Sequence, residues 1–111
     1  MKDLPDQALK AISAYLQVLA EPTRLKILNL LRDQPRHVSE LAELSGFSAA
    51  NVSRHLTQLA QQGLVVRETR GQNVYYQVAD PSIYQLCDLV CGHIAKRYER
   101  SAHEANLFNL H

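Results

Sequence analysis

The stretch that decides the fold is Ser48-Ala49-Ala50-Asn51-Val52-Ser53-Arg54-His55-Leu56-Thr57-Gln58-Leu59. It lies between Val38-Ser39-Glu40-Leu41-Ala42 and Gly63-Leu64-Val65-Val66-Arg67. The order predicts a short helix, a tight turn at Gly46-Phe47, a second helix with a polar exposed face, and then a hairpin. This is the pattern of a helix-turn-helix followed by a wing. The second helix of such a unit fits the major groove of double-stranded DNA.

Two further helices are predicted before this unit. The first covers residues 6–20, and its apolar face at helical spacing consists of Ile12, Tyr15, Leu16 and Leu19. The second covers about 22–33 and starts at Pro22, since proline is favoured at the first helical position. This second helix is apolar almost all round, which is typical of a buried helix. Pro35 ends the region.

The helix-turn-helix has clear local boundaries. The third helix is expected at about 38–45, and Gly46 supplies the permissive backbone of the turn. Ser48 is expected to cap the fourth helix, which Gly63 ends. The predicted inward face of the fourth helix consists of Val52, Leu56, Leu59 and Ala60.

A hairpin and a long closing helix complete the chain. Residues 64–69 and 73–79 are rich in Val and Tyr and are separated by Arg70-Gly71-Gln72, which predicts a hairpin. Asp80-Pro81 predicts an N-cap followed by the first residue of a helix that runs to about Glu99. The fold class is therefore mainly α with a β-hairpin wing: four helices, two strands and a last helix. We expect residues 1–111 to form one winged helix-turn-helix domain.

Composition narrows the function. A net charge of only +1 argues against a protein that coats nucleic acid without sequence preference, because such binding depends on neutralising phosphates. No apolar run is long enough to span a bilayer, and no N-terminal signal pattern is visible, so we expect a soluble cytoplasmic protein. No Ser/His/Asp or paired-carboxylate arrangement indicates an enzyme.

A sequence-reading protein needs only a local basic patch, and basic residues gather in the predicted fourth helix and wing. The expected DNA contacts come from Ser48, Asn51, Ser53, Arg54, His55, Thr57, Gln58, Arg67 and Arg70. Arg24 is expected to serve structure or a phosphate and not to read bases. A winged helix that binds another protein is the alternative interpretation.

Three segments carry a resemblance to a known family. Leu19-Ala20-Glu21-Pro22-Thr23-Arg24-Leu25-Lys26-Ile27-Leu28, Val52-Ser53-Arg54-His55-Leu56 and Asn73-Val74-Tyr75-Tyr76 resemble the ArsR/SmtB family of bacterial winged-helix repressors. The resemblance covers about residues 8–98. It implies a homodimer that binds operator DNA and releases it in response to a metal ion, a metalloid or a redox signal. We expect the first and last helices, whose apolar faces are too extensive for one small chain to bury, to form the dimer.

Of two sensor sites of the family, one is absent from this sequence and the other is incomplete. Where the family has a cysteine cluster at the start of the third helix, this chain has Arg36-His37-Val38-Ser39-Glu40. A second family site joins the closing helices of the two chains. Asp80 and His93 match it, but Ser82 and Lys96 occupy its other two positions.

Cys87 and Cys91 remain as the candidate sensor, together with His93. Residues four apart share one helix face, so both sulfurs can reach one thiophilic ion such as arsenite, antimonite, cadmium or zinc. The resemblance implies that Cys87 lies near the two-fold axis of the dimer. Three alternatives stay open: modification of the thiols by an oxidant or reactive sulfur species, plain packing of both cysteines in the core, and a repressor without an effector. His103 and His111 in the tail are not expected to be ligands.

Overall fold

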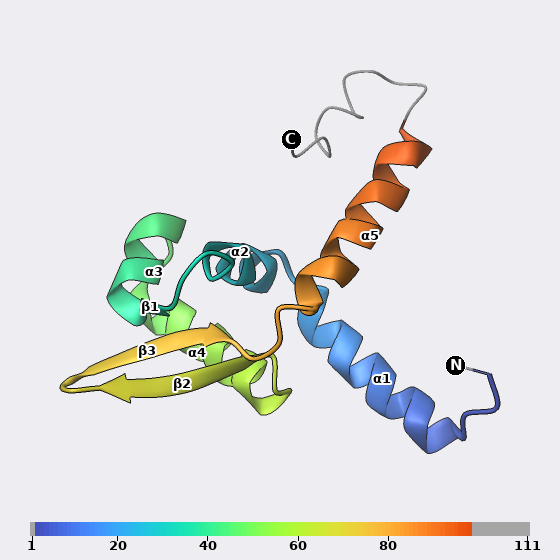
Figure 1. Ribbon diagram of the computed structural model, residues 1–111, viewed down its shortest axis with the longest axis horizontal. Helices are drawn as coiled ribbons and strands as arrows, with labels where there is room; N and C mark the ends of the chain where they lie inside the picture. The colour runs from blue at the N-terminus through green and yellow to red at the C-terminus, as the bar shows by residue number, and fades with distance from the viewer. Residues whose placement is uncertain (1, 99–111) are drawn as a thin grey trace. The chain divides into compact units, whose positions relative to one another are not determined.

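The computed structural model describes residues 2–98, and the chain forms two compact units, Met1–Asp80 and Pro81–His111. The first unit contains α1 (Asp6–Leu19), α2 (Pro22–Leu30), β1 (Arg36–His37), α3 (Val38–Ser45), α4 (Ala49–Gln61), β2 (Val65–Arg70) and β3 (Asn73–Val78) (Figure 1). The described part of the second unit contains α5 (Ile83–Arg97). The predicted winged helix-turn-helix is confirmed. The prediction of one domain over residues 1–111 stays a prediction.

The boundary between α1 and α2 follows from local hydrogen bonding. Glu21 is extended and caps α2, because its carboxylate accepts the Arg24 backbone N–H at 2.9 Å. The helix ends at Leu30, about three residues earlier than predicted. The prediction that this helix is buried on all sides is also wrong, since Leu25 is 42% exposed while Ile27 is fully buried. Only one side of α2 faces the other helices of the first unit.

The turn between α3 and α4 agrees with the sequence prediction. Gly46 has a φ of 82° and its N–H donates to the Ala42 carbonyl at 3.0 Å. The Ser48 hydroxyl accepts the Asn51 N–H at 3.1 Å and so caps α4. The Lys26 ammonium donates to the Ser45 carbonyl at 3.0 Å, which holds this turn to α2.

The end of α4 leads directly into the wing. The Gly63 N–H donates to the Ala60 carbonyl and the Leu64 N–H donates to the Leu59 carbonyl, which is the Schellman pattern with a glycine of positive φ after the cap. The chain therefore reverses at Gly63, as predicted, and enters β2.

The sheet has three antiparallel strands in the order β1-β3-β2. The short strand β1 was not predicted, because two residues carry no detectable alternation. It pairs His37 with Tyr75 on β3. Arg70 belongs to β2 and pairs with Asn73, so the hairpin loop is only two residues long.

The core of the first unit lies where α2, α3 and α4 meet. Its fully buried side chains include Ile27, Leu41, Val52, Leu56 and Leu59. Three of these come from α4 and confirm its predicted inward face. The exception is Ala60, which is exposed.

The closing helix starts two residues later than predicted. Pro81 and Ser82 form a turn in which the Tyr84 N–H donates to the Pro81 carbonyl at 3.0 Å, and Ser82 precedes the first helical residue. Asp80 is therefore not the N-cap. Among the described residues, no helix is long and apolar enough to cross a membrane.

Candidate nucleic-acid interface

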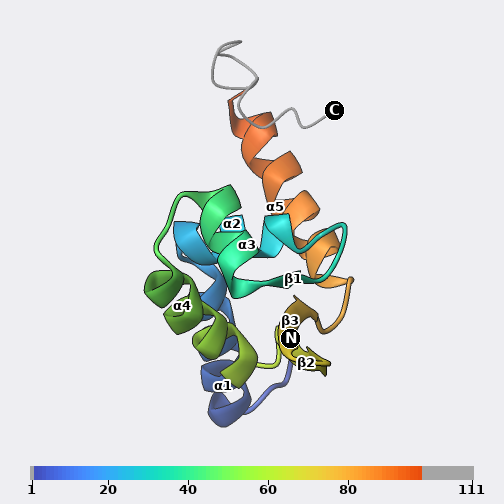
Figure 2. The same cartoon turned by 90° about the vertical axis from the view of Figure 1, so that its left-hand side faces the viewer.

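The exposed face of α4 carries the candidate DNA-reading side chains. Ser53, Arg54 and Thr57 are exposed, while Val52 and Leu56 are fully buried. Because these buried residues recur every three or four positions, they fix the rotation of the helix about its axis. Figure 2 shows α4 beside α3 in the first unit. Polar side chains of α4 are thereby held pointing into solvent.

The polar groups on this face are partly ordered by one another. The Arg54 guanidinium donates to the Asn51 side-chain oxygen, one helical turn earlier. The Thr57 hydroxyl donates to the Ser53 carbonyl at 2.9 Å. Arg54 keeps further N–H donors for a ligand, and an arginine with two parallel donors matches the O6 and N7 atoms of guanine.

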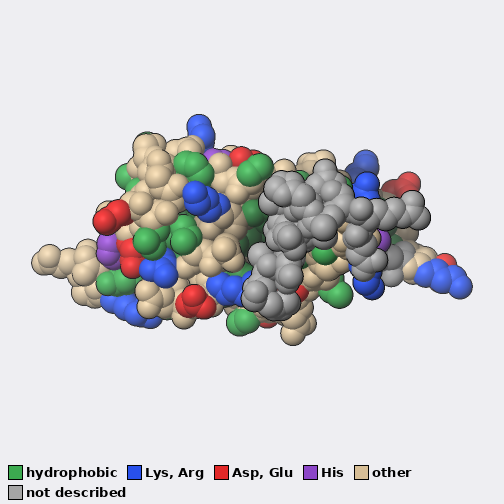
Figure 3. Space-filling view, turned by 90° about the horizontal axis from the view of Figure 1, so that it is seen from above, with side chains coloured by type: hydrophobic (Ala, Val, Ile, Leu, Met, Phe, Trp, Pro, Cys, Tyr) green, Lys and Arg blue, Asp and Glu red, His purple; other side chains and the backbone are tan. Residues whose placement is uncertain are grey.

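The electrostatics of α4 favour an anion. The helix contains Arg54 and no Asp or Glu, and the acid-free stretch runs from residue 44 to residue 67. Elsewhere the charges are mixed: on the face seen in Figure 3, basic and acidic side chains are interspersed. With a net charge of only +1, the acid-free stretch around α4 is the feature that favours an anion.

The two wing arginines lie on opposite faces of the hairpin. Arg67 and Arg70 are three residues apart on β2, and side chains alternate along a strand. The Arg70 guanidinium donates to Glu68 at 3.2 Å and lies 5.1 Å from the centre of the Tyr75 ring. The hydrogen bond and charge of Glu68 raise the pKa of Arg70 further above its usual value. The wing thus presents Arg67 on one face and an Arg70–Tyr75 pair on the other.

Two predicted DNA contacts point elsewhere. His55 is only 8% exposed, and its Nδ1 accepts the Arg24 Nε–H at 3.2 Å. The Gln58 side-chain oxygen accepts another N–H of the same guanidinium. The expectation that His55 reads DNA is therefore corrected: this side chain belongs to the inward side of α4. Its position three residues after Val52 was the available signal in the sequence.

The carboxyl of Glu21 completes this inward cluster. Its Oε2 lies 3.8 Å from His55 Nδ1 and accepts the Arg24 backbone N–H. Desolvation acts to raise the pKa of Glu21, but the hydrogen bond from the Arg24 backbone, the nearby His55 and Arg24 side chains, and a hydrogen bond from the Thr23 side chain together hold it below its ordinary value. Glu21 is therefore charged at neutral pH.

The candidate sensor residues lie on α5. Cys87 and Cys91 are both half-buried and are not joined in a disulfide, and His93 is exposed. Within residues 2–98 there is no group of three or more His, Cys, Asp or Glu side chains that can hold a metal ion. One chain therefore offers two sulfur donors on one helix face, and a complete site needs a further donor. His103 and His111 lie outside the described residues.

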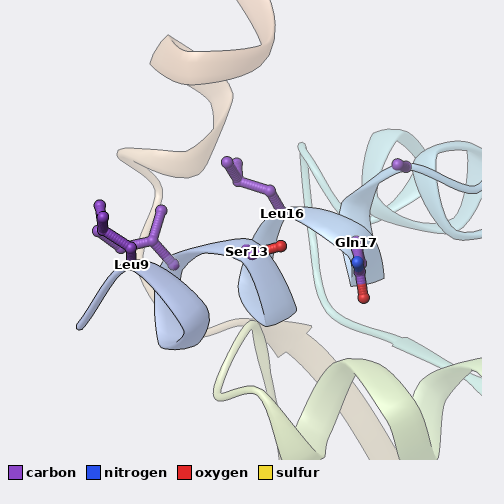
Figure 4. Close-up of a pocket in the computed structure, with 6 residues that line it drawn as sticks. Leu9, Ser13, Leu16 and Gln17 are labelled. Atoms are coloured by element: carbon purple, nitrogen blue, oxygen red, sulfur yellow. The ribbon is translucent and has the colours of Figure 1, made fainter. Parts of the chain in front are cut away.

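An open apolar groove runs along α1. It is lined by Leu9, Ile12, Ser13, Leu16, Gln17 and Ala20, and Figure 4 shows these side chains along the helix. Leu9 and Leu16 are 40% and 46% exposed. On α5, Leu89 is 72% exposed and Val90 is 50% exposed. Both helices thus carry large apolar side chains that this single chain leaves in water.

Comparison with known proteins agrees with this geometry. Residues 21–66 match the family described as "Bacterial regulatory protein, arsR family". Over 90 residues the chain is 39% identical to the HTH-type transcriptional regulator NmtR of Mycobacterium tuberculosis, covering 81% of this chain and 75% of NmtR. The chain belongs to the ArsR family. As an ArsR-family member it is a transcriptional regulator with a winged helix-turn-helix and is not an enzyme.

Two further similarities extend this picture of the ArsR-family chain. Over 72 residues it is 36% identical to a "Probable mercury resistance operon repressor" of Streptomyces lividans, covering 65% of this chain and 58% of the repressor. The solution structure of the homodimeric winged helix-turn-helix DNA-binding domain of Mb0332 from Mycobacterium bovis superimposes with a TM-score of 0.76. That match has 28% identity and covers 90% of this chain and 95% of the domain.

Proposed function

We propose that this chain is a homodimeric, sequence-specific repressor that binds operator DNA through α4 and leaves it when an effector reaches Cys87 and Cys91. One observation carries the DNA-binding part: α4 exposes Ser53, Arg54 and Thr57 on a face without acidic residues, while its opposite face is fixed in the core. A protein-binding winged helix is the alternative, and the acid-free face argues against it.

In the proposed complex, α4 lies in the major groove. Arg54 contacts a base, Asn51, Ser53 and Thr57 contact bases or phosphates, and Ser48 lies at the end of the helix nearest the backbone. The wing contacts the phosphate backbone or the minor groove through one of its two arginine-bearing faces. Two copies related by a two-fold axis read an inverted repeat.

Sequence-specific binding to an operator can be tested without knowing the regulated gene. We expect selection of bound fragments from a random pool of double-stranded DNA to enrich an imperfect inverted repeat, because a symmetric dimer presents two identical reading helices. Binding of the enriched sequence is then measured by fluorescence anisotropy against a scrambled fragment of the same length. Equal affinities for the two fragments would contradict sequence-specific binding.

The dimer is proposed from the apolar side chains that the single chain leaves exposed on α1 and α5. The Mb0332 domain, which this chain resembles, is homodimeric. Burying Leu16 and Leu89 against a second copy removes apolar surface from water, at about 25 cal/mol per Å².

We expect sedimentation at micromolar concentration to give a dimer. Leu16→Glu places a charge in the proposed interface and is expected to shift the protein towards monomer. Leu44→Glu is the matched control, since Leu44 is also about half exposed, at 49%, but lies on α3. A wild-type monomer, or equal effects of the two substitutions, would contradict an interface that includes α1.

A thiophilic metal or metalloid is the proposed effector. Two thiolates four residues apart on α5 supply soft donors, which select ions such as arsenite, cadmium or zinc. The similar Streptomyces protein is described as a mercury resistance repressor, and mercury is a thiophilic metal too. The effector must bind the DNA-free state more tightly than the DNA-bound state, and DNA weakens effector binding by the same factor. An oxidant or a persulfide acting on the same thiols is the second candidate.

We expect arsenite or cadmium to release operator DNA from the wild type. The double variant with Cys87→Ser and Cys91→Ser is expected to keep its affinity for DNA and to lose the release of DNA by these ions, because a serine hydroxyl is a poor ligand for a soft ion. The measurement is a DNA-release titration with each ion and with a persulfide donor, with thiols counted before and after. Release of DNA by the persulfide alone would assign redox sensing. Equal release from the wild type and the double variant would mean that the two cysteines only pack in the core.

A further inference from the structure

One guanidinium joins three helices of the first unit. The Arg24 Nε–H donates to His55 Nδ1 at 3.2 Å and an N–H of the same group donates to the Gln58 side-chain oxygen. A third donor reaches the Val18 carbonyl at 3.2 Å, in the last turn of α1. Arg24 itself lies in the first turn of α2. The side chain therefore connects α1 and α2 to the middle of α4, on the side opposite to the DNA-reading face.

The link to His55 depends on the protonation of the imidazole. Nδ1 can accept the Arg24 Nε–H only while it carries no proton. In the doubly protonated imidazolium both ring nitrogens are donors, so Nδ1 can no longer accept a hydrogen bond. The imidazolium and the guanidinium are then two neighbouring cations. The Glu21 carboxylate, 3.8 Å from Nδ1, is then the nearest anionic partner. Imidazoles are the side chains that change charge in the pH range of about 5 to 8.

We propose that Arg24 and His55 form a proton-sensitive link that positions α4 for operator binding. With His55 neutral, the guanidinium holds α4 against the start of α2 and the end of α1. When His55 is protonated, this hydrogen bond is lost and the imidazolium turns towards Glu21. Of the two contacts between Arg24 and α4 only the one with Gln58 then remains, so that the reading orientation of α4 is held less firmly. This inference rests on the proposed DNA binding and assigns Arg24 and His55 as positioning residues.

The charged groups around His55 support the assignment to this pair. Arg24 and Glu21 approach it from α2. The exposed Arg54 of α4 bonds Asn51 on the opposite face. On α2, the exposed Lys26 donates to the Ser45 carbonyl. On α3, Glu40 is bonded to Arg36 and Glu43 is exposed; on β2, Glu68 is bonded to Arg70 and Arg67 is exposed.

The sign of the expected pH effect separates the proposal from simple electrostatics. Protonating any histidine adds positive charge, which by itself strengthens binding to polyanionic DNA. The proposed link predicts the opposite, since the reading helix loses one of the two contacts by which Arg24 positions it. Lowering the pH from about 8 to about 5.5 is expected to weaken operator binding about tenfold, the scale of one hydrogen bond with a charged donor.

The decisive variant is His55→Gln. A glutamine oxygen can accept the Arg24 Nε–H and does not titrate, so this variant is expected to bind the selected operator as the wild type does at about pH 8 and to stay within about threefold of that affinity at about pH 5.5. His37→Asn is the matched control. It removes another imidazole, which caps α3, and asparagine is itself a good cap. This control is expected to keep the wild-type pH dependence.

Three outcomes decide between the ideas. No operator preference at about pH 8 would contradict the proposed function itself. Specific binding that does not weaken on acidification, or that weakens equally in His55→Gln, would overturn the inference alone. Should His55→Gln fail to fold by circular dichroism, nitrogen-15 NMR of the wild type decides. The Arg24 Nε–H signal is expected to shift with the same pH midpoint as operator affinity, and an unchanged signal while affinity falls would refute the link.

Discussion

Arg54→Ala is expected to remove most of the preference for the operator, weakening specific binding by about 1–3 kcal/mol while leaving binding to random DNA nearly unchanged. Arg54 is the exposed cation of α4, and its contact with Asn51 orders the side chain before DNA arrives. An arginine that makes a bidentate contact with guanine reads sequence, whereas a phosphate contact supplies affinity without discrimination. The measurement is anisotropy with operator and scrambled fragments.

Arg67→Ala provides the matched comparison. Arg67 is also an exposed arginine, but it lies on the wing, where a phosphate contact is expected. Its loss is expected to lower the affinity for the operator and for the scrambled fragment by the same factor. The salt dependence of binding is expected to fall by about one phosphate contact. If Arg54→Ala also lowered the affinity for both fragments equally, Arg54 would contact a phosphate. The base contacts would then have to come from Asn51, Ser53 or Thr57.

The helix-turn-helix was predictable because its signals are local. Gly46 and Gly63 adopt the positive φ values that end α3 and reverse the chain after α4, and Ser48 caps α4 by bonding a residue only three positions away. The buried face of α4 also follows from spacing alone. Each of these features is decided within a few residues, so no knowledge of the packed fold is needed.

Features that depend on distant residues were missed. The sequence prediction counts His55 among the basic residues of the DNA-binding patch. Its spacing after Val52 indicates the inward side of α4, but its partner Arg24 lies 31 residues earlier and reaches it only in the folded chain. Strand β1 forms because β3 offers an edge for it, and two residues give no pattern of their own. Asp80-Pro81 has the composition of a helix start, yet the chain makes one more turn before α5 begins.

The effector is the least predictable feature, because the proposed site at Cys87 and Cys91 needs donors beyond the two cysteines. Cys87 and Cys91 are two donors where a soft metal needs three or four, and Asp80 and His93 match only half of the family's other site. Sequence spacing shows which donors share a helix face. It does not show which donors a second copy adds.

Leu56→Ala is expected to destabilise the protein by about 2–5 kcal/mol, which is a large part of the about 5–15 kcal/mol that holds a small domain folded. Leu56 has no exposed surface and lies at the centre of the buried face of α4. Truncation leaves a cavity where α4 meets the other helices, and the side chains around it lose their contacts. Leu44→Ala, on the half-exposed α3 residue, is expected to cost much less.

Urea unfolding at one fixed protein concentration measures both changes, since the stability of a dimer depends on concentration. The same variants test how α4 presents its reading face. If the buried leucine fixes the rotation of α4, Leu56→Ala is expected to lose operator preference even at low urea, where circular dichroism still shows a folded protein. Operator affinity equal to that of the wild type in this folded variant would mean that Val52, Leu59 and the contact between Arg24 and Gln58 hold the orientation of α4 without Leu56.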